Sequence, residues 1–332
     1  MKKILQYLFE HKTLSREQSR EVLTNIARGL YNESELAAFI TVFLMRSITI
    51  DELQGFRDAL LELCVRVDLG GHDTIDIVGT GGDGKNTFNI STLACFIVAG
   101  TGQKVAKHGN YGASSISGAS NVMEQLGYKH KNDAGRLRQE IDSANICFLH
   151  APLFHPALKT VGPIRKNLGV RTFFNMLGPM VNPAFPKFQL VGVYNLEMAR
   201  VYNYLLQQTE GRFTIIHSLD GYDEISLTGD TKVITNQGEK ILTPEELGKR
   251  MVNATDIYGG NTVEEAAKLF TKILKVEGSW AQNAVVLANA AMALHCTGAY
   301  KSYEDAYGAA VESLESKRAY GALQKLIALQ TP

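Results

Sequence analysis

The sequence predicts an α/β protein with a small all-helical N-terminal domain and a larger domain whose mainly parallel central sheet is covered by helices. Three observations lead to this fold class. Residues 1–70 carry helix signals only, strand and helix patterns alternate from Thr74 onward, and short apolar runs such as 213–219 are typical of strands buried on both faces.

The helical part begins with three N-terminal capping boxes, in which a capping side chain is followed three residues later by Glu or Gln. These pairs are Ser15 with Gln18, Asn32 with Glu35, and Thr49 with Glu52. Between them, Leu36, Phe39, Ile40 and Phe43 have the spacing of one helix face. There is no strand signal before Thr74, so we expect a helical domain over residues 1–70.

The α/β part begins at Thr74 and extends to the end of the chain, residues 74–332. Strands are expected over 76–80, 103–107, 145–150, 188–194 and 212–219, and helices over 92–100, 119–126 and 198–208. The proline-rich segment 155–186 interrupts the alternation and is expected to complete the helical domain in part. After Thr262, which forms another capping box with Glu265, the chain reads as helical again.

Composition excludes several classes of protein. The 332 residues contain 34 Lys plus Arg and 34 Asp plus Glu, so a basic nucleic-acid surface is not indicated. No apolar run approaches the roughly 18 residues of a membrane span, and the N-terminus is unlike a signal peptide. Cys64, Cys95, Cys147 and Cys296 are widely spaced among apolar neighbours, as expected for buried thiols in a reducing compartment. We therefore expect a soluble cytoplasmic protein without membrane or nucleic-acid partners.

The first motif is the glycine-rich turn GTGGDGK, residues 79–85, which follows a predicted strand. Closely spaced glycines let backbone N–H groups converge on an anion, and a helix that begins near Ser91 would direct its positive end to the same point. The nucleotide P-loop pattern fails because Asn86 stands where a hydroxyl is required. The alternative is a plain strand-to-helix turn with Ser91 as its N-cap.

The second motif is KHGNYGASSISG, residues 107–118, which follows the next predicted strand. Lys107 could act as a point charge for phosphate, and the glycines and serines could present N–H and hydroxyl groups. Ligands of open α/β sheets bind at the carboxyl ends of strands. Two such loops after successive strands indicate a ligand with more than one phosphate. His108 alone is more typical of a structural histidine.

Two further motifs carry charge. Asp223 and Glu224 in LDGYDEISL, residues 219–227, are hard oxygen ligands suited to magnesium, and the alternative is a solvated acidic loop. Arg165 in PIRKNLG could clamp a carboxylate or phosphate, and the alternative is a solvated helix face.

Taken together, these motifs resemble the anthranilate phosphoribosyltransferase family over essentially the whole chain. The blocks GTGGD, NIST, KHGN with its following SS, HPA–RKNLGVRT–NMLGP–NP and DGYDE stand in the family's order. The resemblance implies transfer of the phosphoribosyl group of phosphoribosyl pyrophosphate (PRPP) to the amine of anthranilate. It also implies a helical domain hinged to a larger α/β domain, and a homodimer formed through the helical domains.

The resemblance assigns site residues by position. PRPP would be bound by Gly79, Gly82, Asp83, Thr87, Asn89, Ile90, Ser91, Thr92, Lys107, His108, Gly109, Asn110, Tyr111, Gly112, Ala113, Ser114, Ser115 and Ala119. Anthranilate would be bound by Gly79, Asn110, Arg165 and Gly178. One magnesium ion would be held by Ser91, and a second by Asp223 with Glu224. No residue is assigned as a general acid or base.

Three positions depart from the family pattern. Many members carry a basic residue where this chain has Tyr111, and a Ser and an Asp where it has Ala119 and Asn121. The resemblance therefore does not imply a side-chain contact to phosphate from 111 or 119, which leaves backbone contacts at these positions. A pyrimidine nucleoside phosphorylase and a nucleic-acid-binding relative of the same fold are the alternatives, and the acidic pair together with the chain length argue against the phosphorylase.

Overall fold

The computed structural model describes residues 1–112 and 115–330. It contains two compact units, Met1–Val67 with Ala151–Phe185, and Asp68–His150 with Pro186–Pro332. Two residues assigned to PRPP, Ala113 and Ser114, lie outside the described residues.

The first unit is built from helices. They are α1 (Lys2–Phe9), α2 (Arg16–Ala27), α3 (Glu33–Met45), α4 (Ile50–Leu63), α8 (Ala151–Phe154), α9 (Pro156–Leu168), α10 (Phe174–Leu177) and the 3-10 turn η1 (Gly178–Met180). The predicted capping boxes are confirmed at the starts of α2, α3 and α4, because each N-cap side chain accepts the N3 amide and each N3 side chain accepts the N-cap amide. Residues 1–73, all of them described, contain no strand.

An aromatic cluster forms the core of this unit. Phe39 and Phe43 of α3 and Phe56 of α4 pack around Phe173, with ring centroids 4.8 Å apart for Phe56 and Phe173. All four rings are buried. Because Phe173 comes from the segment 151–185, that segment and α1–α4 share one hydrophobic core.

The second unit contains a seven-stranded sheet, and the α/β fold class is confirmed. The strands are β1 (Thr74–Gly79), β2 (Lys104–Gly109), β3 (Ile146–His150), β4 (Phe188–Gly192), β5 (Arg212–Ser218), β6 (Thr231–Thr235) and β7 (Gly238–Leu242). Their order is β3-β2-β1-β4-β5-β6-β7. The first five pair in parallel, and β6 and β7 continue the sheet as an antiparallel hairpin that the sequence analysis did not predict.

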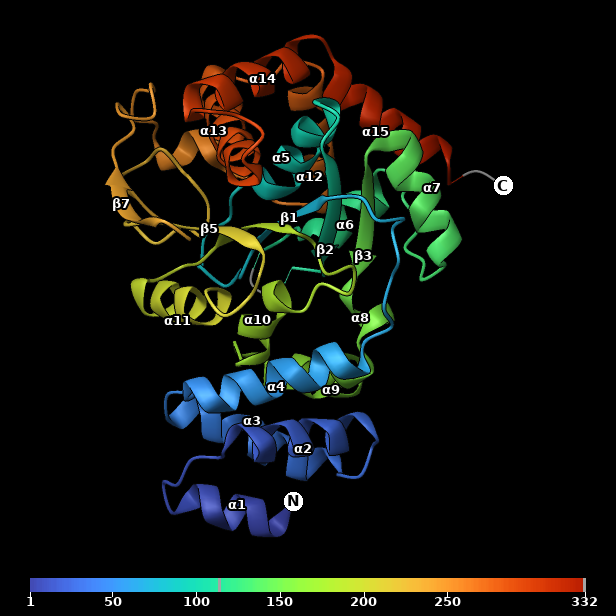
Figure 1. The fold of residues 1–332 in the computed structure, drawn as a ribbon, viewed down its shortest axis with the longest axis vertical. Coiled ribbons are helices and arrows are strands. Elements are labelled where there is room, and N and C mark those ends of the chain that lie inside the picture. Colours follow the sequence, from blue (N-terminus) through green and yellow to red (C-terminus); the bar gives the residue numbers. More distant parts are fainter. Residues whose placement is uncertain (113–114, 331–332) are drawn as a thin grey trace. The chain divides into compact units, whose positions relative to one another are not determined.

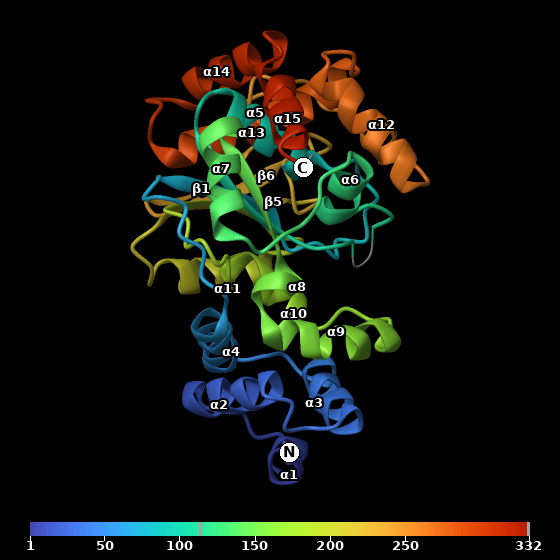
Figure 2. The ribbon, with the colours of Figure 1, turned by 90° about the vertical axis from the view of Figure 1, so that its right-hand side faces the viewer.

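Helices cover both faces of this sheet. They are α5 (Ile90–Gly100), α6 (Ala119–Gln125), α7 (Ala134–Ala144), α11 (Leu196–Leu206), α12 (Val263–Leu274), α13 (Trp280–Thr297), α14 (Tyr303–Glu315), α15 (Arg318–Ala328) and the turn η2 (Ala254–Ile257). Both ribbon views show α5 and α13 on one face and α11 on the other (Figures 1 and 2). The alanine-rich α13 is buried along most of its length.

The predicted capping box at Thr262 is half correct. Its hydroxyl accepts the amide of Glu265, but the Glu265 carboxylate accepts the amide of Asn261 rather than that of Thr262. Among the described residues, no helix combines the length and apolar character that a membrane crossing requires.

The strand order contains a topological switch point. The chain adds β2 and β3 on one side of β1, whereas β4 and β5 lie on the other side. In open α/β sheets, ligands bind at the carboxyl ends of the strands where the order reverses. The glycine-rich turn after β1 lies at this point, because β1 and β4 are neighbours and end in register at Gly79 and Gly192.

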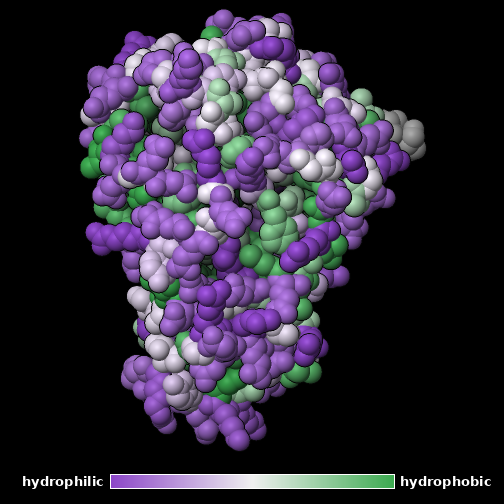
Figure 3. All heavy atoms as spheres, viewed as in Figure 1, coloured by the Kyte–Doolittle hydropathy of each residue, from purple (hydrophilic) through white to green (hydrophobic). Residues whose placement is uncertain are grey.

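One face of the molecule is drawn by hydropathy in Figure 3. Hydrophilic residues dominate the view, and hydrophobic residues gather at its left edge, on the side where Figure 1 shows β7. Ile241 in β7 is half exposed. Ile241 is exposed beside Glu239 and Lys240, so this edge of the sheet presents both apolar and charged side chains.

Candidate active site

The loop after β5 lies across the ends of β1 and β4. The Gly81 amide donates to Oδ2 of Asp223 at 2.7 Å. A Cβ on Gly79 would meet the Asp223 carboxylate, and a Cβ on Gly192 would meet the Asp223 carbonyl group. Both strand ends therefore need glycine, because the DGYDE loop approaches their backbones too closely for any side chain.

The start of α5 binds a carboxylate. The Ser91 amide donates to Oε1 of Glu224 at 2.9 Å, and the Thr87 hydroxyl lies 3.4 Å from Oε2. The helix begins at Ile90 with Asn89 as its N-cap, so the alternative of Ser91 as an ordinary N-cap is wrong. Asn89 makes no side-chain cap and donates instead to the Ser117 carbonyl at 2.8 Å, which joins the two phosphate-type loops.

The acidic pair is buried rather than solvated. Asp223 and Glu224 are each 8% exposed, which rules out the alternative of a solvated acidic loop. Burial, and next the negative charge of Asp83, raise the pKa of Asp223 to about 7. Burial raises the pKa of Glu224 well above its ordinary value, and the charge of Asp223 adds to the rise. Burial also raises the pKa of Asp83. The negative charges of Asp83 and Asp223 thus act on neighbouring buried carboxyl groups at this edge of the sheet.

The donor chemistry fits magnesium. Carboxylate and hydroxyl oxygens are hard ligands, and a divalent cation would relieve the repulsion among the three acidic groups. Across residues 1–112 and 115–330, no cluster of three or more His, Cys, Asp or Glu side chains has the arrangement of a complete metal site. Magnesium usually binds one or two carboxylates and takes its other ligands from water and substrate phosphates. The arrangement therefore suits an ion that is shared with a phosphate ligand.

The second loop begins on a buried lysine. Lys107 is 2% exposed, and its ammonium donates to the Ile77 carbonyl of β1 at 2.6 Å. Its charge opposes the rise in the pKa of Glu224. The next residue, His108, donates its amide to Oδ1 of Asp76 at 3.2 Å. Lys107 thus lies inside the sheet layer. Its positive charge partly compensates the negative charge of the acidic groups, because charges interact more strongly in the low-dielectric interior than in water.

The end of this loop is anchored to α6. The Tyr111 hydroxyl donates to Oε1 of Glu124 at 2.7 Å, and the Tyr111 ring packs edge-on against His150 at 4.8 Å. Oδ1 of Asn121 accepts the amides of Gly112 and Gly118, each at 3.0 Å. These contacts fix the two sides of the loop relative to one helix end.

Two predicted anthranilate residues belong to the helical unit. Arg165 lies in α9, its guanidinium donates to Oδ1 of Asn175 at 3.1 Å, and it lies over the Phe174 ring at 5.6 Å. Burial lowers the pKa of Arg165, so the alternative of a solvated helix face does not describe it. Gly178 begins the turn η1.

Known proteins resemble this chain over nearly its whole length. A family model described as the α/β domain of a glycosyl transferase family matches residues 71–320, and the helical bundle domain of that family matches residues 2–64. An anthranilate phosphoribosyltransferase of Flavobacterium johnsoniae is 62% identical over 98% of both chains. The chain belongs to the anthranilate phosphoribosyltransferase family.

Solved structures of the family share the fold. The enzyme of Thermus thermophilus has a TM-score of 0.90 and 32% identity over 99% of both chains. The Saccharomyces cerevisiae enzyme, solved in complex with PRPP and Mg, also has a TM-score of 0.90, with 26% identity over 98% of this chain and 96% of that chain.

The departures from the anthranilate phosphoribosyltransferase pattern have structural roles here. Tyr111 and Asn121 hold the loop to α6 through the contacts above. Ala119 is the first residue of α6, and a Cβ on Gly109 would approach its methyl group at 3.3 Å. Small residues at both positions let the strand end lie close to the helix start.

Sequence reasoning missed several residues that build the site. Gly192 admits the acidic loop, Asp76 accepts the His108 amide, and Ser120 lies 2.8 Å from Nδ1 of His150. Gly192 alone had a local signal, because a glycine inside an apolar strand often marks a close backbone approach. The other two contacts join residues 30 or more positions apart, which no local pattern reveals.

Proposed function

We propose that the protein transfers the phosphoribosyl group of PRPP to the amine of anthranilate, giving N-(5-phosphoribosyl)anthranilate and pyrophosphate. This reaction is the second step of tryptophan biosynthesis from chorismate. The observation that carries the proposal is the glycine turn at the switch point, with Asp223 and Glu224 buried directly behind it. Full-length identity of 62% to a family member supports it.

The proposed PRPP site uses backbone groups first. The amides of the turn 79–85 and the first turn of α5 would bind phosphate oxygens, because converging N–H groups and a helix N-terminus both favour anions. The residues proposed for PRPP that the structure describes are Gly79, Gly82, Asp83, Thr87, Asn89, Ile90, Ser91, Thr92, Lys107, His108, Gly109, Asn110, Tyr111, Gly112, Ser115 and Ala119. All of them lie on the loops after β1 and β2 or at the adjoining strand and helix ends.

Ser91, Asp223 and Glu224 would hold magnesium, and we propose two ions per site. Bound magnesium supplies positive charge that stabilises the departing pyrophosphate. Asp223 and Glu224 are already oriented by the amides of Gly81 and Ser91, so little further conformational entropy would be lost when they bind magnesium.

We assign anthranilate to Gly79, Asn110, Arg165 and Gly178 on the family resemblance. In the reaction, a bond forms between the amine nitrogen and ribose C1 while the bond from C1 to the pyrophosphate oxygen breaks, and the amine then releases a proton. An arylamine is a nucleophile at neutral pH without a base, so positioning and charge stabilisation suffice.

The activity test follows the fluorescence of anthranilate. Consumption should require PRPP and magnesium together, and should stop when the metal is chelated. Turnover of thymidine with inorganic phosphate, and none of anthranilate, would instead establish the pyrimidine nucleoside phosphorylase.

Arg165 offers a second test. A charged hydrogen bond to the anthranilate carboxylate is worth roughly 1.5–3 kcal/mol, so Arg165→Ala should raise the KM for anthranilate about tenfold or more and that for PRPP much less. An unchanged anthranilate KM would remove Arg165 from the site.

We also propose that the protein is a cytoplasmic homodimer that binds no nucleic acid. The four cysteines are free and buried, as suits a reducing compartment, and the formal net charge is zero. Light scattering would measure the oligomeric state, and a salt-dependent DNA-binding assay would detect a nucleic-acid-binding relative.

A further inference from the structure

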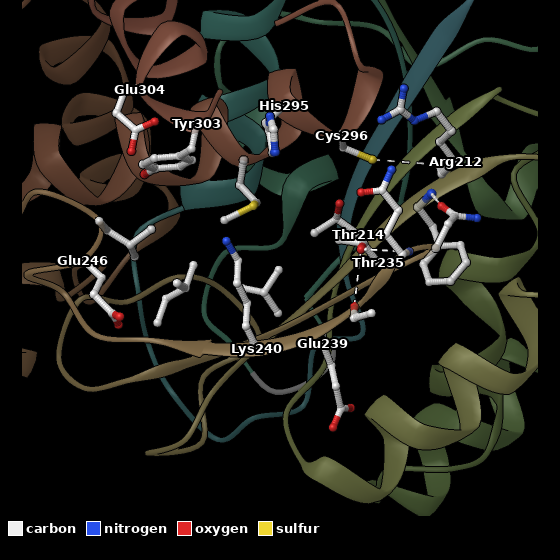
Figure 4. A pocket seen from close by; sticks show the side chains of 18 residues that line it. Arg212, Thr214, Thr235, Glu239, Lys240, Glu246, His295, Cys296, Tyr303 and Glu304 are labelled. Atoms are coloured by element: carbon white, nitrogen blue, oxygen red, sulfur yellow. Dashed lines mark hydrogen bonds between the residues drawn. The ribbon is translucent and has the colours of Figure 1, made fainter. Parts of the chain in front are cut away.

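A pocket lies at the amino end of β5, whereas the acidic loop follows the carboxyl end of that strand. It has a volume of about 390 Å³ and is lined by residues of β5, the β6–β7 hairpin, the end of α13 and the start of α14 (Figure 4). Arg212, at the start of β5, and Thr214 line it, whereas Asp223 and Glu224 follow the other end of the same strand. None of the residues proposed for PRPP, anthranilate or magnesium lines this pocket.

A lysine projects into this pocket from the inner face of an edge strand. Lys240 of β7 lies directly opposite Val233 of β6, which is 2% exposed, and residues opposite each other in an antiparallel pair share a face. Ile241, on the other face of the strand, is 50% exposed. Lys240 is itself exposed, as are Glu239 and Ile241, so it lines the open side of the pocket. Figure 4 shows Lys240 extending toward His295.

The ammonium of Lys240 forms no ion pair with the described residues, although its charge helps to lower the pKa values of Glu304 and His295. Among the described residues, no carboxylate lies within 4 Å of its ammonium. Three carboxylates also line the pocket, but each has interactions elsewhere. Glu239 pairs with Lys232 at 2.9 Å, and Glu246 accepts the Thr243 amide at 2.8 Å.

The third carboxylate, Glu304, lies in the first turn of α14. Hydrogen bonds from its own backbone and from Ser302 lower its pKa, and the charges of Lys240 and His295 add smaller contributions. Arg212 adds a second positive charge at the far end of the pocket (Figure 4).

A buried hydroxyl and an apolar wall complete the pocket. The phenol oxygen of Tyr303 is buried, and no hydrogen-bond partner for it is found in the described part of the chain. A buried hydroxyl without a hydrogen-bond partner costs the folded protein free energy. A ligand that accepts a hydrogen bond from this hydroxyl would therefore stabilise the protein. Met292, 3% exposed, and Val233 provide the apolar surface.

We propose that this pocket binds a small organic carboxylate with an aromatic or branched apolar body. The carboxylate would pair with the Lys240 ammonium and accept a hydrogen bond from the Tyr303 hydroxyl, while the apolar body would pack on Met292. The volume lies in the 300–1,000 Å³ range of small-molecule sites, which are typically apolar with a few convergent polar groups. The proposal does not depend on the function proposed above.

A different explanation for Lys240 is protection of the sheet edge. Charged residues that point inward from an edge strand discourage pairing with another chain. That explanation needs no ligand, and it leaves the buried Tyr303 hydroxyl unexplained. It predicts that the pocket binds nothing selectively, so binding measurements separate the two.

The experiment uses the full chain labelled with ¹³C at its methionine methyl groups, with benzoate as the probe. The Met292 signal, assigned by its loss in Met292→Leu, reports on this pocket even if benzoate also binds elsewhere. The expected result is a saturable shift of that signal. Lys240→Gln should weaken binding about tenfold and Tyr303→Phe about threefold, as expected for a charged and a neutral hydrogen bond. Lys325→Gln, an exposed lysine on α15, serves as the matched control and should bind like the wild type.

Three outcomes would overturn the proposal. One is a Met292 signal that does not move up to about 10 mM benzoate, which corresponds to negligible affinity. Another is equal affinity in Lys240→Gln and the wild type, with methyl spectra and thermal melting showing that both are folded. The third is equal affinity for benzoate and the neutral benzyl alcohol, which would leave no role for the charge.

Discussion

The two ends of β5 differ in how their polar groups are satisfied. At the carboxyl end, Asp223 and Glu224 accept amides from Gly81 and Ser91, so the acidic groups are held in place by the chain itself. At the amino end, the Tyr303 hydroxyl has no hydrogen-bond partner among the described residues, and Lys240 is exposed. A preorganised site and the proposed ligand pocket therefore lie at opposite ends of one strand, and only the first is marked by a sequence motif.

The difference follows from what each end requires of the chain. Close approach of backbone segments demands glycines at fixed positions, and these appear in the sequence as GTGGD and as Gly192. The amino-end pocket needs only side chains that come from four separate segments, with no constraint on neighbouring residues. Motif reading therefore detects the first kind of site and not the second.

The largest effect is expected from removing the two acidic groups at the carboxyl end of β5. Asp223→Asn combined with Glu224→Gln should lower turnover of anthranilate at least about a hundredfold, the scale seen when a preorganised charge stabiliser is lost. The variant should still fold, because the raised pKa values show that the ionised pair costs the folded state free energy, and neutral amides relieve that cost. Turnover against magnesium concentration, with thermal melting, measures both.

The same variant distinguishes the two ends. Benzoate binding at Met292 should be unchanged, since the pocket lies at the other end of the strand. Wild-type turnover with wild-type magnesium dependence would contradict the metal assignment and leave only Ser91 as a ligand.

A glycine substitution tests the close approach at the end of β4. Gly192→Ala places a methyl group against the Asp223 carbonyl, and overpacking of this kind typically costs about 1–3 kcal/mol. Turnover should fall as well, because the acidic loop must move. Gly308→Ala is the matched control, since nothing lies within 4 Å of its added methyl group in α14. It should stabilise the protein by about 0.4–1 kcal/mol. Equal denaturation midpoints for the two variants would refute the close approach.

Local signals and long-range contacts explain what could be predicted from sequence. The caps at Ser15, Asn32 and Thr49 were predicted because donor and acceptor lie three residues apart. The parallel sheet followed from the alternation of strands and helices. The β6–β7 hairpin was missed because β7 is short and exposed from Gly238 to Ile241, so it carries no alternation of buried apolar and exposed polar residues.

The burial of the acidic pair could not be predicted locally. Its sequence, DGYDE, is that of an exposed turn, and only Gly79 and Gly192 on neighbouring strands let it fold against the sheet. The roles of individual residues toward PRPP, anthranilate and magnesium stay predictions that the proposed experiments test.

The pH dependence of stability tests how the carboxyl edge is organised near β3. Burial, and next the charge of His130, lower the pKa of His150 to about 4. A lowered pKa means that the unfolded chain binds the proton more tightly. The free energy of unfolding is therefore undiminished by His150 above pH 6.5, the ordinary pKa of histidine. It decreases as the pH falls from 6.5 toward 4, because the unfolded chain binds the proton first. His150→Gln lacks this dependence.

Between pH 7.5 and 5.5 the wild type should lose about 1 kcal/mol more than His150→Gln, on the scale of 1.4 kcal/mol per pKa unit. His155, with a pKa also lowered to about 4 by burial, is present in both proteins and cancels from the difference. Urea unfolding at several pH values measures it, and parallel curves for the two proteins would mean that His150 is not held neutral.

The smallest expected effect concerns the anchor of the second loop. Tyr111→Phe removes the hydroxyl that donates to Glu124 and keeps the ring that packs on His150. A hydrogen bond of this kind contributes about 0.5–1.5 kcal/mol, so the KM for PRPP should rise a few-fold while the rate at saturation changes little. Tyr111→Ala, which also removes the ring contact, should have the larger effect on KM. Tyr7→Phe, a half-exposed tyrosine of α1, is the control and should leave both constants unchanged. If Tyr111→Phe instead lowers the rate at saturation and leaves the KM for PRPP unchanged, the contact between Tyr111 and Glu124 does not position the loop for PRPP binding. The second loop would then not be part of the preorganised carboxyl end.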